Sequence, residues 1–234
     1  SSDVCSSDLM DVAGSVYFPL DGSLAPRRFM ASIQQRVRNA GVAFLWNTDV
    51  SGWAVGSGGT VRGVHASGRR TIEGDAFVIA AGAWSPVLSA KLPVKLPMQA
   101  GKGYSVTLPD PPRMPGLGAI CTEARVSVSP MQDALRFAGT LEITGLDETI
   151  DAGRVRAIVD AVPRYYPDFK AADFDRVLPW RGLRPCTPDG LPYIGRTARH
   201  PNLVYATGHA MMGMSLAPIT GSLVAQVIGD ERTP

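Results

Sequence analysis

The feature that most constrains this chain is an apolar strand that leads through a glycine turn into an apolar helix. Asn202 to Thr207 predicts the strand, Gly208 and His209 the turn, and Gly213 to Ile228 the helix. A helix start presents unpaired N–H groups and a partial positive charge, and glycine lets a flat ligand approach the backbone closely. The unit therefore predicts a site for a phosphate or for the edge of a flavin ring, with an ordinary strand-to-helix connection as the alternative.

A second constraint is the stretch from Trp180 to Gly195, where glycine and proline recur so often that few backbone conformations remain. We expect an irregular, rigid loop there. Arg184 lies inside this stretch, and the planar guanidinium of arginine suits bidentate binding of a carboxylate. The alternative, equally supported by the residues alone, is that Arg184 pairs with a structural carboxylate such as Asp189.

The first part of the chain predicts alternating helices and strands. A helix is expected from Pro26 to Gly41, a short strand from Val42 to Trp46, and a hairpin from Asp49 to Ala66. Ala76 to Ala81 is continuously apolar, which is typical of a strand buried on both faces of a parallel sheet, and it ends in a strand-to-helix turn, Gly82 to Pro86. These patterns predict an α/β domain.

Residues 91 to 180 have a different character, because repeated prolines make helices unlikely in their first part. Antiparallel strands are expected over Gly103–Leu108, Arg125–Ser129 and Ala134–Ile143. Asp151 to Tyr165 has the apolar spacing of a helix. We therefore expect a β-rich domain over residues 91–180, inserted into an α/β domain made of residues 10–90 and 181–234. Residues 1–9 resemble a translated sequencing-adapter remnant and are expected to be a non-native leader.

Composition argues against several functions. The net charge of +2 is too small to indicate nucleic acid as a partner, and no run of about 18 uncharged apolar residues predicts a membrane span. Cys5, Cys121 and Cys186 lack the spacing of a metal site or a disulfide framework, and so few cysteines favour a cytoplasmic location, with peripheral association at the inner membrane left open. His209, a single histidine in a glycine turn, is expected to position or pack rather than catalyse.

Five segments in register resemble the D-amino-acid oxidase-like family of FAD-dependent enzymes, and within it the bacterial D-amino acid dehydrogenases. The resemblance implies a partial FAD-binding domain, Rossmann-like and of the glutathione-reductase type, with an inserted antiparallel-sheet substrate domain. It covers nearly everything from Gly14 onward. The strongest segments are Trp180–Gly195 and Asn202–Gly221, and the weaker ones are Asp75–Ser85, Lys102–Ser105 and Gly139–Asp147.

Site residues follow from this resemblance. Arg184 is expected to hold the substrate carboxylate, with Tyr104 and Arg136 contributing from the inserted domain. No metal is implied. The residues expected at FAD are Val50 near the adenine, Ala81, Gly82 and Trp84 in the first turn, and Gly208, His209, Ala210, Met211, Met212, Gly213, Met214 and Ser215 around the isoalloxazine ring.

The activity implied by the resemblance is oxidative deamination of a D-amino acid. The α-hydrogen leaves as hydride to the flavin, and the imine that remains is hydrolysed to a 2-oxo acid and ammonia. A sarcosine-, proline- or hydroxyproline-type secondary amine is the nearest alternative substrate, and a 2-hydroxy acid suits Arg184 equally well. The expected electron acceptor is a quinone or an electron-transfer protein.

Two features depart from the family pattern. No strand–GxGxxG–helix segment, which binds the dinucleotide in this family, precedes Gly14, so we expect the chain alone to bind FAD poorly or not at all. Glycine oxidase-like members carry a second carboxylate-binding arginine where this chain has Met211, which favours a dehydrogenase-like pocket. A rival interpretation is therefore a catalytically incomplete fragment, or a subunit that needs a partner to bind FAD.

Overall fold

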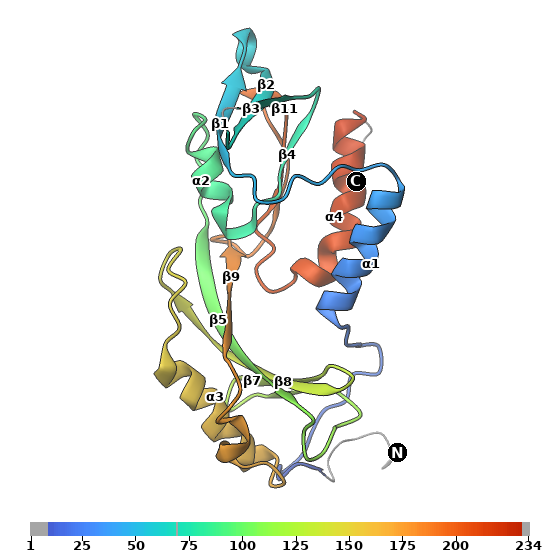
Figure 1. Cartoon of the computed structure of the whole chain (residues 1–234), viewed down its shortest axis with the longest axis vertical. Helices are drawn as coiled ribbons and strands as arrows, with labels where there is room; N and C mark the ends of the chain where they lie inside the picture. The colour runs from blue at the N-terminus through green and yellow to red at the C-terminus, as the bar shows by residue number, and fades with distance from the viewer. Residues whose placement is uncertain (1–8, 69, 231–234) are drawn as a thin grey trace. The chain divides into compact units, whose positions relative to one another are not determined.

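The chain folds into helices and mixed sheets that form two compact units (Figure 1). The structure is a computed structural model that describes residues 9–68 and 70–230; the predictions made for Cys5 and for residues 1–8 of the leader lie outside the described residues. Unit 1 comprises the described residues up to Ala40, Lys102–Glu142 and Asp147–Gly182. Unit 2 comprises Gly41–Gly101, Ile143–Leu146 and the described residues from Leu183 onward. Their assignment as substrate and FAD-binding domains stays a prediction.

Unit 1 is built around a five-stranded sheet with strand order β6-β7-β8-β5-β9, against which helix α3 packs (Figure 1). Strands β5 and β9 have residues in both units. The side chain of Asp151 caps α3 by accepting a hydrogen bond from the backbone N–H of Arg154 at 3.0 Å. The elements are α1 (Pro26–Asn39), β5 (Gln99–Pro109), β6 (Ala119–Cys121), β7 (Val126–Pro130), β8 (Ala134–Ile143), α3 (Ala152–Tyr165), η4 (Ala171–Phe174) and β9 (Trp180–Cys186).

The core of unit 1 is a single apolar cluster centred on Phe137, which is fully buried. The ring of Phe137 makes edge-on contacts with Tyr166, Phe169 and Phe174, at centroid distances of 6.3, 5.8 and 5.4 Å. Aromatic pairs in this geometry each contribute about 0.5–1.5 kcal/mol beyond the burial of their surface. Side-chain packing of the rings therefore stabilises this unit strongly.

Unit 2 contains two three-stranded sheets. One is the antiparallel sheet β1-β2-β3, and the other has the order β10-β11-β4, in which β11 runs parallel to β4 and antiparallel to β10. Its smaller core is formed by Val61, Ile79, Leu92, Leu203 and Tyr205. The elements are β1 (Val50–Val55), η2 (Ser57–Gly59), β2 (Val61–Ala66), β3 (Arg70–Glu73), β4 (Phe77–Ile79), η3 (Gly82–Trp84), α2 (Ser85–Ser89), β10 (Tyr193–Thr197), β11 (His200–Thr207) and α4 (Gly213–Ile228).

One amide side chain joins the two sheets of unit 2. Asn202, at the start of the apolar part of β11, donates to the carbonyl oxygens of Val61 at 2.7 Å and Asp75 at 2.9 Å. Its own oxygen accepts from the backbone N–H of Val61 at 2.9 Å. The amide thus satisfies backbone groups on β2 and in the turn before β4, which fixes where the parallel strands begin.

Most of the elements expected from the sequence are confirmed. The helices at Pro26–Asn39, Ala152–Tyr165 and Gly213–Ile228, the hairpin of β1 and β2, and the strand at His200–Thr207 all form. The strands expected at Gly103–Leu108, Arg125–Ser129 and Ala134–Ile143 form as β5, β7 and β8, and β7 pairs antiparallel with β8. In the described part of the chain, no helix has the length and apolarity needed to cross a membrane.

Three local expectations were wrong. Val42–Trp46 forms no strand, because no neighbouring strand pairs with it; the rings of Phe44 and Trp46 stack instead. Trp180–Gly195 is not one irregular loop, since β9 and most of β10 lie within it and are paired in sheets, which leaves only residues 187–192 irregular. The strand β4 is not buried on both faces: the side chain of Val78 remains 42% exposed.

Candidate functional site

Two turns follow the carboxyl ends of the parallel neighbours β4 and β11 in unit 2 (Figure 1). The hydroxyl of Thr207, the last residue of β11, donates to the carbonyl oxygen of Gly82 at 3.2 Å and accepts from the hydroxyl of Ser85 at 2.9 Å. These bonds tie the predicted Ala81–Trp84 turn to the start of the Gly208 turn. The carboxyl ends of adjacent parallel strands are where open α/β sheets bind ligands.

The second turn requires glycine at position 208. Its φ angle is +86°, and a Cβ atom added there would lie 2.6 Å from the Cγ2 atom of Thr187. Helix α4 begins five residues later at Gly213, and its N-cap residue, Met212, makes no side-chain capping bond. The first N–H groups of the helix therefore have no side-chain acceptor at the cap, as an anion-binding helix start requires.

The two segments that most constrain the sequence, Trp180–Gly195 and Asn202–Ile228, meet at this turn. The backbone N–H of Ala210 donates to the carbonyl oxygen of Pro185 at 3.0 Å, and Cys186 and His209 form an antiparallel β-bridge. Strand β9 therefore docks against the glycine turn within unit 2. Arg184 directly precedes Pro185 in the chain. The backbone hydrogen bond of Pro185 therefore places Arg184 in the same part of unit 2 as the predicted flavin turn.

Arg184 carries a guanidinium that is partly unsatisfied. Its Nη1 atom is buried and has no hydrogen-bond partner among the described residues. The alternative pairing with Asp189 is not observed in the part of the chain that the structure describes; Asp189 accepts from the backbone N–H of Leu191 at 3.1 Å. A buried donor without an acceptor costs free energy, so Arg184 is suited to an anionic ligand that supplies one.

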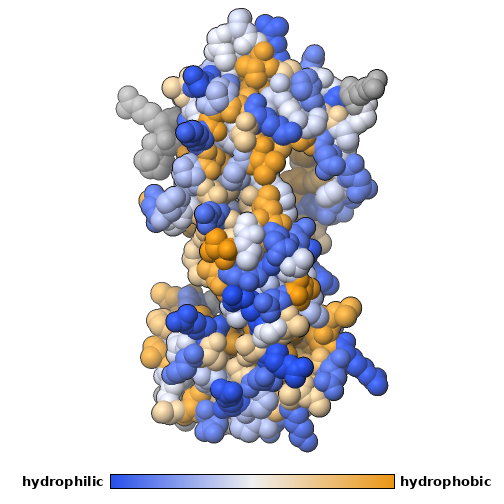
Figure 2. All heavy atoms as spheres, turned by 90° about the vertical axis from the view of Figure 1, so that its left-hand side faces the viewer, coloured by the Kyte–Doolittle hydropathy of each residue, from blue (hydrophilic) through white to orange (hydrophobic). Residues whose placement is uncertain are grey.

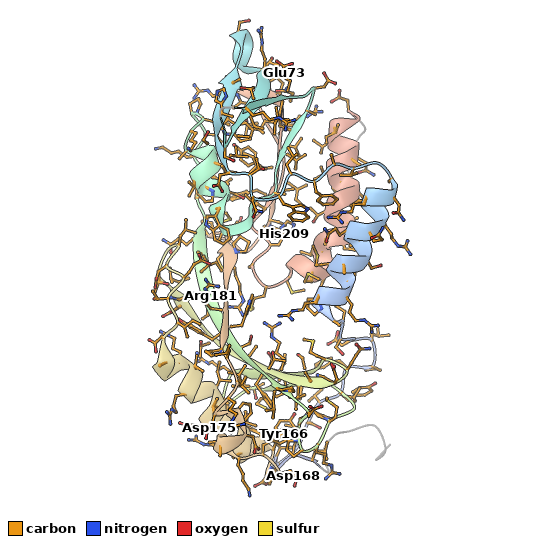
Figure 3. All side chains as sticks on the ribbon, in the orientation of Figure 1. Glu73, Tyr166, Asp168, Asp175, Arg181 and His209 are labelled. Carbon is orange, nitrogen blue, oxygen red and sulfur yellow. The ribbon has the colours of Figure 1, made fainter. Side chains whose placement is uncertain are left out.

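His209 is held by its ring (Figure 3). Its Nε2 atom lies 2.9 Å from the hydroxyl of Thr220 on α4, and burial lowers the pKa of the imidazole. The neutral ring thus links the glycine turn to the helix, as expected of a positioning residue. Met211 and Met212, by contrast, are exposed, with 75% of Met211 accessible to solvent. The remaining predicted flavin residues follow directly as Gly213, Met214 and Ser215, the first turn of α4.

The other predicted site residues lie elsewhere. Val50 begins β1 and so belongs to the antiparallel sheet of unit 2. Tyr104 and Arg136 lie in unit 1, on β5 and β8. The hydroxyl of Tyr104 donates to Glu142, and the side chain is fully buried. The guanidinium of Arg136 lies over the ring of Trp180, 5.1 Å from its centroid.

Tyr104 and Arg136 point to opposite faces of the five-stranded sheet. Tyr104 belongs to the apolar cluster beneath α3, together with Leu135 and Phe137. Because side chains alternate along a strand, Arg136 faces away from that cluster. The structure therefore brings Arg136 and Trp180 together, and it places Tyr104 in the interior.

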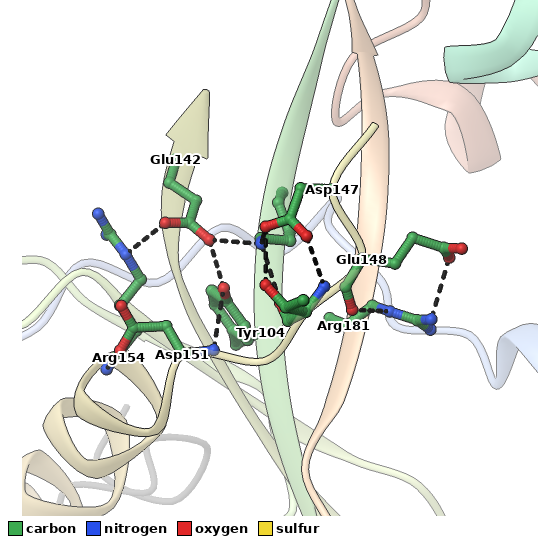
Figure 4. Close-up of polar contacts among 9 residues, drawn as sticks. Tyr104, Glu142, Asp147, Glu148, Asp151, Arg154 and Arg181 are labelled. Carbon is green, nitrogen blue, oxygen red and sulfur yellow. Dashed lines mark hydrogen bonds and ion pairs between the residues drawn. The ribbon is translucent and has the colours of Figure 1, made fainter. Parts of the chain in front are cut away.

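Sequence reasoning missed a charged cluster that lies around Lys102 in unit 1 (Figure 4). Lys102 is buried and pairs with Glu142 and Asp147, and Glu142 also pairs with Arg154. The one available signal was a lysine at an inward position of an apolar strand, because a lysine is almost never fully buried unless it is paired. Sequence reasoning also missed the hydroxyl bonds between Ser85, Thr207 and the Gly82 turn.

Apolar side chains are exposed on the surface of the molecule (Figure 2). In unit 2, mostly apolar residues line a cavity of about 340 Å³. Gln99 supplies the only polar side chain of its lining, so the cavity offers no group that could carry charge or move a proton. The lining residues are Ala83, Pro86, Val87, Met98, Gln99, Ala100, Ile143, Gly145 and Leu146.

Comparison with curated proteins finds relatives named D-amino acid dehydrogenase. That of Paramagnetospirillum magneticum is 36% identical over 220 residues, which cover 93% of this chain and 51% of the relative. That of Rhizorhabdus wittichii is 33% identical over 223 residues, covering 94% and 52%. The chain thus spans about half the length of the curated relatives it matches.

Solved structures show the same fold. Glycine oxidase from Geobacillus kaustophilus superposes with a TM-score of 0.75 at 26% identity, over 87% of this chain and 54% of that one. L-proline dehydrogenase from P. horikoshii superposes with a TM-score of 0.82 at 21% identity, over 97% and 62%. The sequence profile of the DAO family, described as FAD dependent oxidoreductase, matches residues 3–227. Paired glycine turns at the ends of parallel strands, a docked arginine strand and a profile match over almost the whole chain lead to one conclusion: this chain belongs to the DAO family of FAD-dependent oxidoreductases.

Proposed function

We propose that this chain supplies the flavin-facing and substrate-facing parts of an FAD-dependent enzyme that oxidises the C–N bond of a D-amino acid. The products would be a 2-oxo acid and ammonia. The observation that carries the proposal is the buried Nη1 atom of Arg184, which lies on a strand bonded to the glycine turn and has no hydrogen-bond partner among the described residues. The carboxylate that every amino acid carries would satisfy this donor and orient the substrate.

The residues of unit 2 fit an FAD ring. Gly208 and Gly82 both have positive φ angles at the carboxyl ends of adjacent parallel strands, and α4 begins without a side-chain cap. In the Rossmann-like arrangement that we propose, Gly208–Ser215 and the Ala81–Trp84 turn hold the isoalloxazine, and Val50 lies toward the adenine. When bound, FAD supplies the acceptor for the two electrons and the hydrogen that leave the substrate's Cα.

The protein's own residues then bind and orient. Arg184 holds the carboxylate, so that the Cα–H bond takes one direction relative to the glycine turn. His209 remains a neutral ring fixed by Thr220, and it keeps the turn in place without adding charge. Arg136, stacked on Trp180, is proposed as a second polar contact for the substrate, with the buried Tyr104 supporting the sheet that carries it.

A D-amino acid dehydrogenase also needs an acceptor for its electrons. A quinone or an electron-transfer protein is our proposal for that partner, supported by the names of the curated relatives, which are dehydrogenases. A secondary amine of the proline type would use the same carboxylate contact at Arg184. The experiment that tests the proposal must therefore include both kinds of amine.

The test is anaerobic flavin reduction by a chimera in which this chain replaces the matching half of the Paramagnetospirillum magneticum enzyme. We expect a yellow protein whose visible absorbance is bleached by one or more D-amino acids, while their L-enantiomers leave it unchanged. Bleaching by proline or sarcosine instead would assign the secondary-amine alternative. A flavin-loaded chimera that no amine or 2-hydroxy acid bleaches, although the parent enzyme is bleached, would contradict the proposal.

A further inference from the structure

Lys102 is a fully buried cation on strand β5, its side chain 2% exposed. Its ammonium lies 2.9 Å from Oδ2 of Asp147, 3.0 Å from Oε1 of Glu142 and 2.9 Å from the carbonyl oxygen of Thr149. A lysine ammonium has three N–H donors, and here three acceptors surround it. Such complete satisfaction is what allows a charge to stay buried.

The acceptors of Lys102 come from two ends of one connection, the segment between β8 and α3 (Figure 4). Glu142 lies at the end of β8, whereas Asp147 and Thr149 lie near the start of α3. Asp147 in turn accepts from the backbone N–H of Thr149 at 3.0 Å and from its hydroxyl at 2.7 Å. One ammonium therefore ties both ends of the connection to β5.

Glu142 extends the cluster to helix α3. Its Oε2 atom lies 2.8 Å from Nε of Arg154, and its Oε1 atom also accepts from the hydroxyl of Tyr104. That hydroxyl lies 3.4 Å from the backbone nitrogen of Asp151, the residue that caps α3. The cluster thus joins β5, the end of β8 and the first turn of the helix.

Glu142 can reach the cluster only because β8 is irregular at Thr140. Leu135 and Phe137 face the apolar cluster, and a Cβ atom on Gly139 would lie 3.3 Å from Ile158 on α3, so odd-numbered residues point inward. Glu142 points to the same side, although strict alternation would turn it outward. Thr140, with a φ angle of +58°, is the irregular residue that reverses the alternation.

A left-handed conformation is costly for threonine. A β-branched residue with positive φ is an outlier, and such residues persist only where the surrounding structure holds them. Thr140 gains no compensation from its own hydroxyl, since the buried Oγ1 atom has no hydrogen-bond partner among the described residues. The ion pairs of Glu142 are the interactions that this conformation makes attainable.

We propose that Lys102 is a positioning residue, a charged clamp that holds the β8–α3 connection against β5 and sustains the left-handed conformation of Thr140. Taken with the proposed function, on which this second role rests, the clamp keeps the sheet that carries Arg136 in one arrangement for the substrate. In this role Lys102 acts through Glu142 and Asp147, to which its ammonium is bonded.

The charges around the clamp are balanced. Lys102 and Arg154 face Glu142 and Asp147. Asp151 points its carboxylate to the helix backbone, and the neighbouring Glu148 pairs with Arg181 at 3.0 Å. Burial opposes the charge of Lys102, but its hydrogen bonds to Asp147, Glu142 and Tyr104 outweigh that penalty and raise its pKa above the usual value. Lys102 therefore stays charged and paired at physiological pH.

The first experiment is hydrogen–deuterium exchange of the full chain carrying Lys102→Met, compared with Lys95→Met as a control at an exposed lysine. We expect exchange in peptides spanning residues 143–151 to rise by about tenfold or more, because the buried carboxylates lose their partner. Peptides of β7, and all peptides of the Lys95→Met variant, should keep the original rates. An unchanged rate over residues 143–151 would overturn the proposal.

A second pair of variants covers the case in which Lys102→Met does not fold. Asp147→Asn removes only the more exposed partner and should raise exchange over the same peptides by a smaller factor. Thr140→Gly relieves the left-handed strain, so in combination with Asp147→Asn it should return exchange toward the original rate. If Thr140→Gly does not reduce the effect of Asp147→Asn, Thr140 is not held by the clamp.

A kinetic readout separates positioning from stability alone. In the chimera, Asp147→Asn should raise KM severalfold and leave kcat nearly unchanged, as expected when binding geometry is loosened uniformly. A fall in kcat with an unchanged KM would contradict a positioning role. The exchange measurements need neither flavin nor amine, so they test the clamp even if the proposed oxidation proves wrong.

Discussion

Different interactions stabilise the two units of this chain. Unit 1 buries one large apolar cluster that includes five aromatic rings, and it carries a satisfied ion cluster beside it. Unit 2 has a core of five buried residues. Its backbone is held by two glycine turns, by the Asn202 amide that joins two sheets, and by hydroxyl hydrogen bonds at the strand ends. In unit 2, the buried Nη1 atom of Arg184 has no hydrogen-bond partner among the described residues. Unit 1 is thus stabilised mainly by side-chain packing, and unit 2 mainly by hydrogen bonds at its turns and strand ends.

The largest effect should come from the aromatic core of unit 1. Phe137→Ala removes a fully buried ring and its three edge-on contacts, so we expect a loss of about 3–5 kcal/mol in the free energy of unfolding. Leu203→Ala is the matched change in unit 2 and should cost less, about 2–3 kcal/mol. Urea unfolding of both variants measures this. An equal or larger cost for Leu203→Ala would mean that unit 1 is not the more tightly packed unit.

Arg184 and Arg136 should differ in the property that each changes most, which is kcat/KM for Arg184 and stability for Arg136. Arg184→Met in the chimera should lower kcat/KM by roughly a hundredfold, or about 3 kcal/mol, without loss of stability, because it removes an unsatisfied donor. Arg136→Met loses a stacking contact with Trp180 and should lower stability by about 0.5–1 kcal/mol. Arg156→Met on the exposed face of α3 is the control. Normal kcat/KM in Arg184→Met would remove the carboxylate role.

The glycine turn of unit 2 should tolerate no side chain. Gly208→Ala combines a positive φ angle with a contact of 2.6 Å to Thr187, and should cost about 2–3 kcal/mol. Adding Thr187→Ser removes the clashing methyl group, so that only the backbone strain of about 1–2 kcal/mol remains. Gly68→Ala has a positive φ angle with open space around it, and it should match the double variant. Thermal unfolding compares the three.

The smallest effect should be a pH dependence confined to unit 1. The bond from Lys102, followed by those from Thr149, lowers the pKa of Asp147 to about 2, and the bonds from Tyr104 and Lys102 lower the pKa of Glu142. Depressed carboxyl pKa values stabilise the fold above the unfolded values of 3.8 and 4.5, and this contribution is lost as the pH falls toward 2. Screening keeps the effect small, because Asp147 is 41% exposed.

The measurement for this prediction is stability against pH from 6 to about 2, where carboxylate linkage acts. Asp147→Asn should reduce the loss of stability that occurs as the pH falls toward 2. Exchange of unit 2 peptides over the same range should follow the intrinsic pH dependence of amide exchange alone. A raised lysine pKa acts at the other end of the scale: the contribution of Lys102 is complete below 10.5 and is lost only as the pH rises through its higher folded value.

Local pattern alone predicted most of the elements near the candidate site. The run from Asn202 to Thr207 is apolar enough to be a strand in any context, and the residues from Gly213 to Ile228 are apolar enough to be a helix. The glycine predicted to form the turn between them, Gly208, has a positive φ angle. These predictions succeed because strand, turn and helix preferences act within a few residues of the chain.

The interactions that make the site were decided between distant residues. The bond from Ala210 to Pro185, the hydroxyl bonds of Thr207, and the clamp of Lys102 on Asp147, forty-five residues away, appear in no local pattern. The same holds for β9, where pairing in a sheet overrode a composition rich in glycine and proline. Sequence alone therefore predicted most of the elements and the family resemblance, because propensity and motif are local. Tertiary structure alone decided which donors are satisfied, because burial and partner distance exist only after the chain has folded.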